Sequence, residues 1–464
     1  MPASPLIQLV AVGQTDEYLS FNPQLSYFKY VYKRHTRFAL ESLKVTFDGK
    51  SPNLRSVQDK CRVKIPRHGD MLSDINLVMH LPNIYSNSEN DLRFRWIDNF
   101  ATLLIREANI YLGGMGKPID VLYGEWITIW NELSMSTSRQ EQYNVLTGNI
   151  ESNINPKIAD PIVRVGKKNR LYFEGYPYST PNDSIPSIPG QTVVVPLPFY
   201  FTRNMMLGLP LCALQTSEVI VTFDIENVEN LYQVYDSELE MYVSPQYYNS
   251  RHYTTITIRD FVTTTELNAY LEVKYAYLNE AERRVITANK QNNSFLIEQL
   301  YMKQVEVNDI SRIVELNLTT PVKELIWVLR RRDYKRYNTP TNYTQNVHGN
   351  GNKHIMSWAR ILWNKSNERV EEKDAIYYGK IVPYQSHTKI PKTGIYCYSY
   401  AIYPEKWQPS GYYNPSGKYG INSSIQVGLN RDEESDIDYT ITVYAKTYNI
   451  LDILGGMAGF KFAT

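Results

Sequence analysis

The chain has 464 residues, 43% of them hydrophobic, which is enough to bury two large cores. Lys and Arg total 49 against 48 Asp and Glu, and the formal charge of +1 argues against a protein that packages nucleic acid through its overall field. Tyrosine is unusually frequent, with 38 residues against 14 Phe and 7 Trp, and it favours both β-strands and interfaces with one wet side.

The N-terminus is predicted to be a separate arm over residues 1–25. Its first residues, MPASPLIQLVAVGQ, have no basic region and too short an apolar run for a signal peptide, and no stretch of the chain approaches the ~18 apolar residues of a membrane span. We therefore expect a soluble protein made in the cytosol. Asn22-Pro23 favours an extended or turn conformation before the aromatic run from Tyr27 to Tyr32.

Alternation of apolar and polar residues predicts β-strands from the start of the chain to its end. In a half-buried strand successive side chains point to opposite faces, so apolar residues recur at every second position. The predicted strands cover residues 43–47, 75–81, 219–225, 271–277, 425–429 and 441–445. Clusters of Pro, Gly, Asn and Ser between them predict long loops, which on a β-sandwich usually carry surface contacts.

Helical signals are few. The best covers residues 123–133, where Trp126, Ile129, Trp130 and Leu133 recur at helical spacing, and a second covers residues 279–288. Helices do not alternate regularly with strands, so the pattern favours an all-β chain of antiparallel sandwiches with Greek-key or jelly-roll connections.

Two sandwiches fit the length of the chain. The alternation stops after Ile225 and resumes at Thr255 to Ile258, which predicts a boundary between them in this stretch. We expect the first sandwich over residues 26–228 and the second over residues 229–464.

No pattern of catalytic or metal-binding residues appears in the sequence. Cys61, Cys212 and Cys397 lack the short spacing of a zinc site or a disulfide framework, and the acidic run 432–438 lacks the spacing of an EF-hand loop. We therefore expect no enzyme activity, no catalytic residue, no cofactor and no metal. A β-sandwich hydrolase whose two carboxylates meet only in the folded chain remains an alternative.

Two basic clusters are candidates for binding phosphates. One runs from Lys33 to Arg37, and the other joins Arg330, Arg331 and Arg332 to Lys335 and Arg336, with Tyr334 and Tyr337 interleaved. The near-zero net charge favours ion pairs between subunits over nucleic-acid contacts, so no specific nucleic-acid partner is expected.

Ordered motifs along the chain resemble one viral protein family. The string from Gly13 to Leu19, then Asn22-Pro23-Gln24 and Phe28-Lys29-Tyr30-Val31-Tyr32-Lys33-Arg34-His35-Thr36, resembles the opening of the major capsid proteins of nucleocytoplasmic large DNA viruses. Further matching segments follow in order at residues 124–126, 129–133, 195–201, 209–211, 213–215, 277–284, 296–299, 323–327, 408–411 and 448–459. A departure at residues 415–420 concerns loop contacts and not the fold.

The resemblance implies two consecutive eight-stranded jelly rolls, three chains per pseudo-hexagonal capsomer, and capsomers that tile an icosahedral shell. It further implies a location in the virion and, as partners, other copies of the chain, minor capsid and penton proteins, and an internal viral membrane on the inner side. The alternative is a carbohydrate-binding, lectin-like sandwich, because lectins share the jelly roll and exposed aromatic rings stack on sugars.

The candidate contact residues are aromatic or basic. We expect contacts between subunits, or exposure on the exterior, for Tyr27, Phe28, Tyr30, Tyr32, Arg331, Arg332, Trp407, Tyr412 and Tyr413, and for the loops 338–352 and 407–419. The N-terminal arm is expected to lie on the inner side, near the membrane or the minor capsid proteins.

Overall fold

The structure is a computed structural model that describes residues 9–10, 13–55, 60–86, 93–154, 186–288, 293–347, 353–363, 367–415, 423–430 and 438–462. The chain divides into two compact units, Met1–Phe38 and Ala39–Thr464. The first unit contains the helix α2 (Gln14–Ser20), followed by a stretch with little regular structure. The predicted arm of residues 1–25 lies within this first unit.

Two antiparallel sheets form the first half of the larger unit. In one sheet the strands follow the order β1 (Phe38–Thr46), β12 (Tyr270–Leu278), β3 (Met71–His80), β7 (Thr192–Pro196). In the other sheet the order is β2 (Lys60–Ile65), β9 (Val219–Ile225), β5 (Ile105–Leu112), β6 (Asp120–Tyr123). Short additional strands are β4 (Phe94–Trp96), β8 (Leu209–Pro210), β10 (Tyr232–Asp236) and β11 (Met241–Val243).

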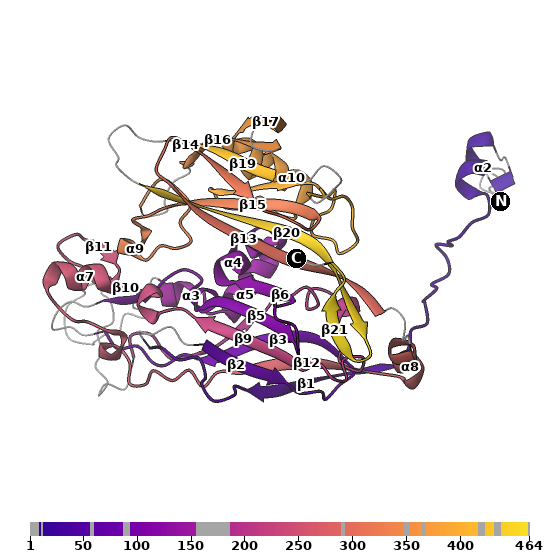
Figure 1. The fold of residues 1–464 in the computed structure, drawn as a ribbon, viewed down its shortest axis with the longest axis horizontal. Helices are drawn as coiled ribbons and strands as arrows, with labels where there is room; N and C mark the ends of the chain where they lie inside the picture. The colour runs from indigo at the N-terminus through magenta and orange to yellow at the C-terminus, as the bar shows by residue number, and fades with distance from the viewer. Residues whose placement is uncertain are drawn as a thin grey trace, which may run out of the picture. The chain divides into compact units, whose positions relative to one another are not determined.

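The second half repeats this architecture. One sheet has the order β13 (Asn293–Val307), β20 (Tyr439–Leu454), β15 (Val322–Arg331), β18 (Ile395–Ser399), and β21 (Met457–Phe460) pairs with β20. The other has the order β14 (Ser311–Leu316), β19 (Ser423–Leu429), β16 (Met356–Trp363), β17 (Asn367–Asp374). Figure 1 shows the strands of each half grouped together.

The two halves have the same strand order when the short additional strands are set aside. In each, the first, eighth, third and sixth strands form one sheet, and the second, seventh, fourth and fifth form the other. This winding of eight strands into two facing sheets is the jelly roll. The prediction of two consecutive jelly rolls is therefore confirmed.

The strand pairing does not follow the boundary expected at residue 228. β12 is the eighth strand of the first roll and pairs with β3 in the register Val273↔Ile75. A division at residue 228 would separate these paired strands. The alternation at Thr255 to Ile258 is not part of a strand, since only the short 3₁₀ helix η3 (Ile258–Asp260) lies there.

The other predicted elements match the structure. Each strand predicted from alternation overlaps an observed one, and the two predicted helices are α4 (Gly124–Ser134) and α8 (Glu280–Ala288). Further helices are α3 (Phe100–Leu103), α5 (Thr137–Leu146), α6 (Glu151–Ile154), α7 (Pro245–His252), α9 (Tyr334–Tyr337), α10 (Val382–Ser386), the 3₁₀ helices η1 (Met205–Leu207) and η2 (Val228–Asn230), and the π-helix η4 (Tyr377–Ile381). None of the helices in the described residues is long and apolar enough to span a membrane.

Helix α4 joins the two halves. Its start packs so closely on the first roll that a side chain at Gly124 would overlap the carbonyl oxygens of Ile105 and Thr102. Trp126 on the same helix is buried, and its ring lies 5.2 Å from that of Tyr444 on β20. One hydrophobic core accordingly includes side chains from both halves, while a second core lies within the second half.

Candidate functional site

The predicted aromatic contacts of the N-terminal segment are exposed. Tyr27, Phe28, Tyr30 and Tyr32 each leave most of their ring surface uncovered within the chain. Leu25 and Val31 are exposed as well. Exposed apolar side chains grouped in this way are often found where proteins bind partners, so the contact role of this segment stays a prediction.

The two predicted contact arginines form ion pairs within the chain. Arg331 Nη2 lies 2.6 Å from Asp333 Oδ2, and its side chain is mostly buried. Arg332 lies 3.4 Å from a carboxylate oxygen of Glu306 and 3.2 Å from one of Asp438. Both guanidinium groups thus have carboxylate partners in their own chain, and ion pairs between subunits stay a prediction for this cluster.

The loop between β18 and β19 brings together the remaining candidates. Trp407 and Tyr412 are exposed, whereas Tyr413 is 8% exposed and does not fit the expectation. Its backbone pairs with that of Val322, with N–H to O distances of 2.8 and 2.6 Å, and the guanidinium of Arg369 lies 4.4 Å from its ring centre. Parts of the predicted contact loops, residues 348–352 and 416–419, lie outside the described residues, as do residues 432–437 of the acidic run.

A buried network of charged side chains lies beside this loop. Glu298 from β13, Lys323 and Glu324 from β15 and Lys446 from β20 are all less than 9% exposed. Lys446 Nζ lies 3.3 Å from a carboxylate oxygen of Glu298 and 3.3 Å from one of Glu324. Lys323 Nζ donates to Glu298 as well, so each carboxylate faces at least one ammonium group.

The network reaches the first jelly roll through two side chains. Arg203 Nη1 lies 2.5 Å from Glu298 Oε2. Trp130 of α4 presents its ring to Lys446, whose Nζ lies 3.6 Å from the ring centre. A desolvated ammonium over an indole face is a favourable cation–π contact. The two rolls are thus joined by buried charge as well as by apolar packing.

His387 links the network to the surface loop. Its Nε2 lies 3.2 Å from Glu324 Oε2, its Nδ1 lies 3.1 Å from Glu405 Oε1, and the side chain has no exposed surface. Burial lowers the pKa of His387, but hydrogen bonds with Cys397, Glu324 and Glu405 outweigh burial and raise it to about 12. The imidazole is therefore a cation at physiological pH.

Burial and the neighbouring charges set the protonation of the other members. Burial raises the pKa of Glu298, yet the charges of Lys446, Arg203 and Lys323 outweigh it and lower the pKa to about 2. Burial lowers the pKa of Lys446 to about 8, although Glu298 and Glu324 oppose that shift. The arrangement is a structural ion network, because its members have little contact with solvent.

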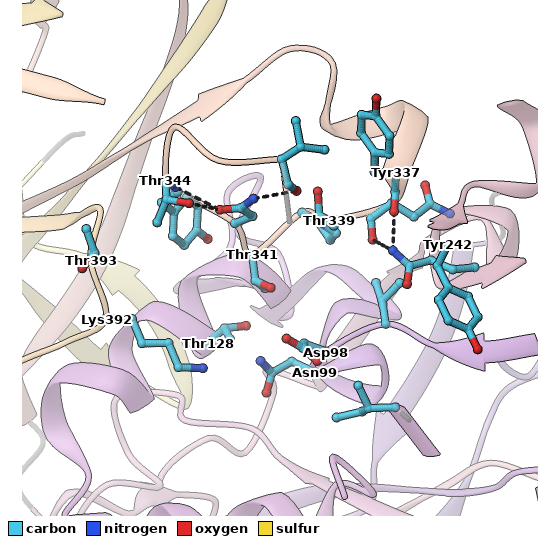
Figure 2. Close-up of a pocket in the computed structure, with 18 of the residues that line it drawn as sticks. Asp98, Asn99, Thr128, Tyr242, Tyr337, Thr339, Thr341, Thr344, Lys392 and Thr393 are labelled. Carbon is cyan, nitrogen blue, oxygen red and sulfur yellow. Dashed lines mark hydrogen bonds between the residues drawn. The ribbon is translucent and has the colours of Figure 1, made fainter. Parts of the chain in front are cut away.

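A polar cleft of about 900 Å³ opens between the two jelly rolls. Thr339, Thr341 and Thr344 follow β15 on one wall, and Asp98, Asn99 and Thr128 from the first roll lie opposite (Figure 2). Glu132 also lines the cleft, but Lys389, Lys392 and Gln140 already contact its carboxylate. The described lining residues offer hydroxyl and amide groups and the carboxylates of Asp98, Glu132 and Glu240.

One group in the described residues has the donors of a metal site. Ligand atoms of Asp236, Glu238 and His252 lie within 4.8 Å of one another. Arg251 occupies the same place, since its Nε lies 3.4 Å from Asp236 Oδ2 and its Nη2 lies 2.9 Å from Glu238 Oε2. The guanidinium supplies the positive charge that a cation would bring, so this group is best explained as an ion-pair cluster.

Each half of the chain matches a model of a known protein family. Residues 26–279 match the model of the major capsid protein N-terminus, and residues 282–459 match that of the large eukaryotic DNA virus major capsid protein. The chain is 30% identical to the major capsid protein of Phaeocystis pouchetii virus, over 99% of this chain and 100% of the relative. It is 28% identical to that of Pyramimonas orientalis virus, over 99% of both chains.

Solved structures have the same fold. A chain of the PBCV-1 virus capsid superimposes with a TM-score of 0.69 at 21% identity, covering 95% of this chain and all of the other. The Faustovirus major capsid protein superimposes with a TM-score of 0.68 at 13% identity, covering 95% of this chain and 94% of the other. The double jelly roll therefore persists where few residues are shared.

Proposed function

The chain belongs to the major capsid protein family of large eukaryotic DNA viruses, and we propose that three copies of it form a capsomer that tiles an icosahedral shell. The observation that carries this proposal is the repeat of one strand order in two halves of the chain. Three chains with two similar rolls each give six similar lobes, which suits a pseudo-hexagonal unit on a lattice of sixfold positions.

The rolls also explain how the chain can act without chemistry. Two facing sheets form a rigid body, and the loops at their ends are free to make contacts. The role is therefore structural, and the chain is not an enzyme under this proposal. The carbohydrate-binding alternative has no support, because the relatives named above are capsid proteins over nearly their whole length.

The first roll is proposed to end at Leu278 and the second to begin at Asn293. The pairing of β12 with β3 supports this division, and so do the two family matches, which meet between residues 279 and 282. Helix α8 then connects the rolls.

The exposed candidates are proposed as contacts in the assembled shell. Tyr27, Phe28, Tyr30 and Tyr32 would bind a neighbouring copy, a minor capsid or penton protein, or the internal membrane on the inner side. Trp407 and Tyr412 would bind another copy. Large exposed aromatic side chains support this assignment, since they dominate the binding energy of protein interfaces.

Size-exclusion chromatography with light scattering tests the proposed trimer. We expect a species of three times 53.9 kDa from the purified full chain. A species that remains monomeric at all concentrations up to those of shell assembly would contradict the proposal, and binding of that monomer to a glycan array would favour the lectin-like alternative.

A further inference from the structure

We infer that the 400–413 loop, between β18 and β19, is a preorganised self-association surface, and that His387 and Glu405 hold it in the conformation that binds a second copy of the chain. The inference rests on the proposed function and deepens it, because it assigns the partner of this loop and the residues that position it.

Four large side chains of the loop face solvent. Ile402 is 67% exposed, Tyr403 54%, Trp407 40% and Tyr412 59%. Tyr and Trp are the side chains that most often anchor protein interfaces, because they bury large areas at a small cost in side-chain entropy. Three such side chains and Ile402, all within one short loop, form a patch that a stable monomer would not need to display.

The loop is fixed to β15 at both ends. The Tyr400 N–H donates to the carbonyl of Lys323 at 3.0 Å, and the Tyr413 N–H donates to that of Val322 at 2.8 Å. Between these points the Tyr403 N–H donates to Ser410 Oγ at 2.9 Å. The exposed side chains therefore start from a backbone with little freedom, which reduces the entropy that binding would remove.

Glu405 fastens the middle of the loop to the buried network. It accepts from the Thr388 N–H at 2.8 Å and from Thr388 Oγ1 at 2.5 Å, and His387 Nδ1 lies 3.1 Å away. Lys406 is bound to the buried network as well, because Lys323 Nζ donates to its carbonyl at 2.9 Å. A charged donor or acceptor takes part in each of these bonds, which makes them stronger than bonds between neutral groups. His387 is thus a positioning residue for the surface.

The charge of the loop points to a protein partner. Glu405 and Lys406 are its only charged residues, so residues 400–413 are neutral as a whole. Binding to an anionic membrane surface needs several clustered cations, whereas the cores of protein interfaces are aromatic and poor in charge. In the proposed trimer and shell each subunit lies beside further copies of the same chain, so a second copy is the protein partner that we assign to this patch.

The surface is tested in the full chain with the double substitution Trp407→Ala and Tyr412→Ala. We expect the concentration needed for half-assembly to rise by at least about tenfold, because such anchors dominate interface energies. Tyr253→Ala is the matched control, since Tyr253 is 95% exposed on a different segment, and it should leave assembly unchanged.

The positioning role is tested with Glu405→Gln, which keeps the side-chain size and removes the charge facing His387. We expect weaker assembly and faster amide exchange over residues 400–413 of the monomer, with amide exchange in β20 unchanged.

The outcomes separate this inference from the proposed function. A wild-type chain that never trimerises overturns both. Normal trimers and shells from the Trp407 and Tyr412 double variant overturn only the surface. If this variant assembles normally but no longer binds phosphatidylserine vesicles, the loop binds membrane and the inference is likewise overturned. If the double variant fails to fold, amide exchange of residues 400–413 in the wild-type chain is compared before and after assembly to test the inference. Protection of residues 400–413 on assembly supports the inference, and unchanged exchange contradicts it.

Discussion

Nδ1 of His387 lies 3.1 Å from Oε1 of Glu405, so a side chain with no exposed surface is in direct contact with a carboxylate of a surface loop. On its other side the same imidazole meets Glu324, which Lys446 connects to Glu298. Through Arg203 this chain of charges reaches the first jelly roll. One network thus supports both the joint between the rolls and the surface proposed to bind another copy.

The first prediction concerns pH. The pKa of His387 is raised to about 12 in the folded chain, against about 6.5 for an unfolded histidine. Its stabilising contribution is therefore complete below pH 6.5 and is lost progressively as the pH rises toward 12. The pKa of Lys446 is lowered to about 8, so its contribution to stability changes in the opposite direction. It rises as the pH increases from 8 to 10.5.

Urea unfolding of the full chain and of His387→Gln at pH 6, 8 and 10 separates the two groups. We expect the difference in unfolding free energy between the two proteins to be largest at pH 6 and to shrink at each higher pH. A difference that stays constant over this range would mean that His387 does not carry a charge in the folded chain.

The second prediction concerns the buried ammonium group. Lys446→Met leaves Glu298 and Glu324 with less buried positive charge, and breaking a buried pair of this kind costs about 3–5 kcal/mol. Adding Glu324→Gln removes one of the stranded charges, so the double variant should recover part of the loss. Denaturant unfolding of the four proteins in this cycle measures the coupling.

Lys60→Met is the control for this cycle. Lys60 is 84% exposed and lies 3.8 Å from Asp224, so its loss should change stability by no more than about 0.5 kcal/mol. Equal effects of Lys446→Met and Lys60→Met would show that the network adds nothing to stability.

The strands could be predicted from the sequence because each buries one face. Their partners could not, since pairing is decided by contacts between distant segments. The alternation at residues 271–277 identifies β12, yet nothing local indicates that it pairs with β3 rather than with a strand of the second roll. The domain boundary expected at residue 228 differs from the strand pairing for this reason.

The candidate contact residues could be predicted from the sequence less well than the strands. Trp407 and Tyr412 are exposed as expected, but Tyr413 is buried, and only its pairing with Val322 determines which of two adjacent tyrosines points inward. Lys323 and Glu324 are the local signal for the ion network, because two adjacent charges stand directly beside the apolar run 325–329 of the same strand. Their partners come from other strands, so the sequence alone does not pair them.

The third prediction concerns two glycines with similar backbone angles. Gly394 has φ +100° and Gly114 has φ +83°, and an alanine at either position is strained by roughly 1–2 kcal/mol. A side chain at Gly394 would also overlap the backbone of Tyr343, whereas no atom lies within 4 Å of one at Gly114. We therefore expect Gly394→Ala to destabilise the chain by a further 1–3 kcal/mol, roughly, compared with Gly114→Ala. Thermal unfolding of both variants measures the difference, and equal values would contradict the close contact with Tyr343.

The last prediction separates packing from association in the N-terminal aromatic run. Replacing Tyr27, Phe28, Tyr30 and Tyr32 together by Ser removes four exposed rings. Exposed side chains contribute little to monomer stability, so the unfolding free energy at low concentration should change by less than about 0.5 kcal/mol per residue. The same change should strongly weaken assembly if these rings bind partners, because buried aromatic anchors carry much of the energy of an interface.

The two measurements together decide what the run does. Loss of stability in the dilute chain would mean that the rings pack inside one monomer, and unchanged assembly would mean that they have no partner in the shell. Weaker assembly with unchanged stability is the expected result. It would show that the aromatic residues are kept for contacts between molecules, which explains why the segment leaves so many large rings uncovered.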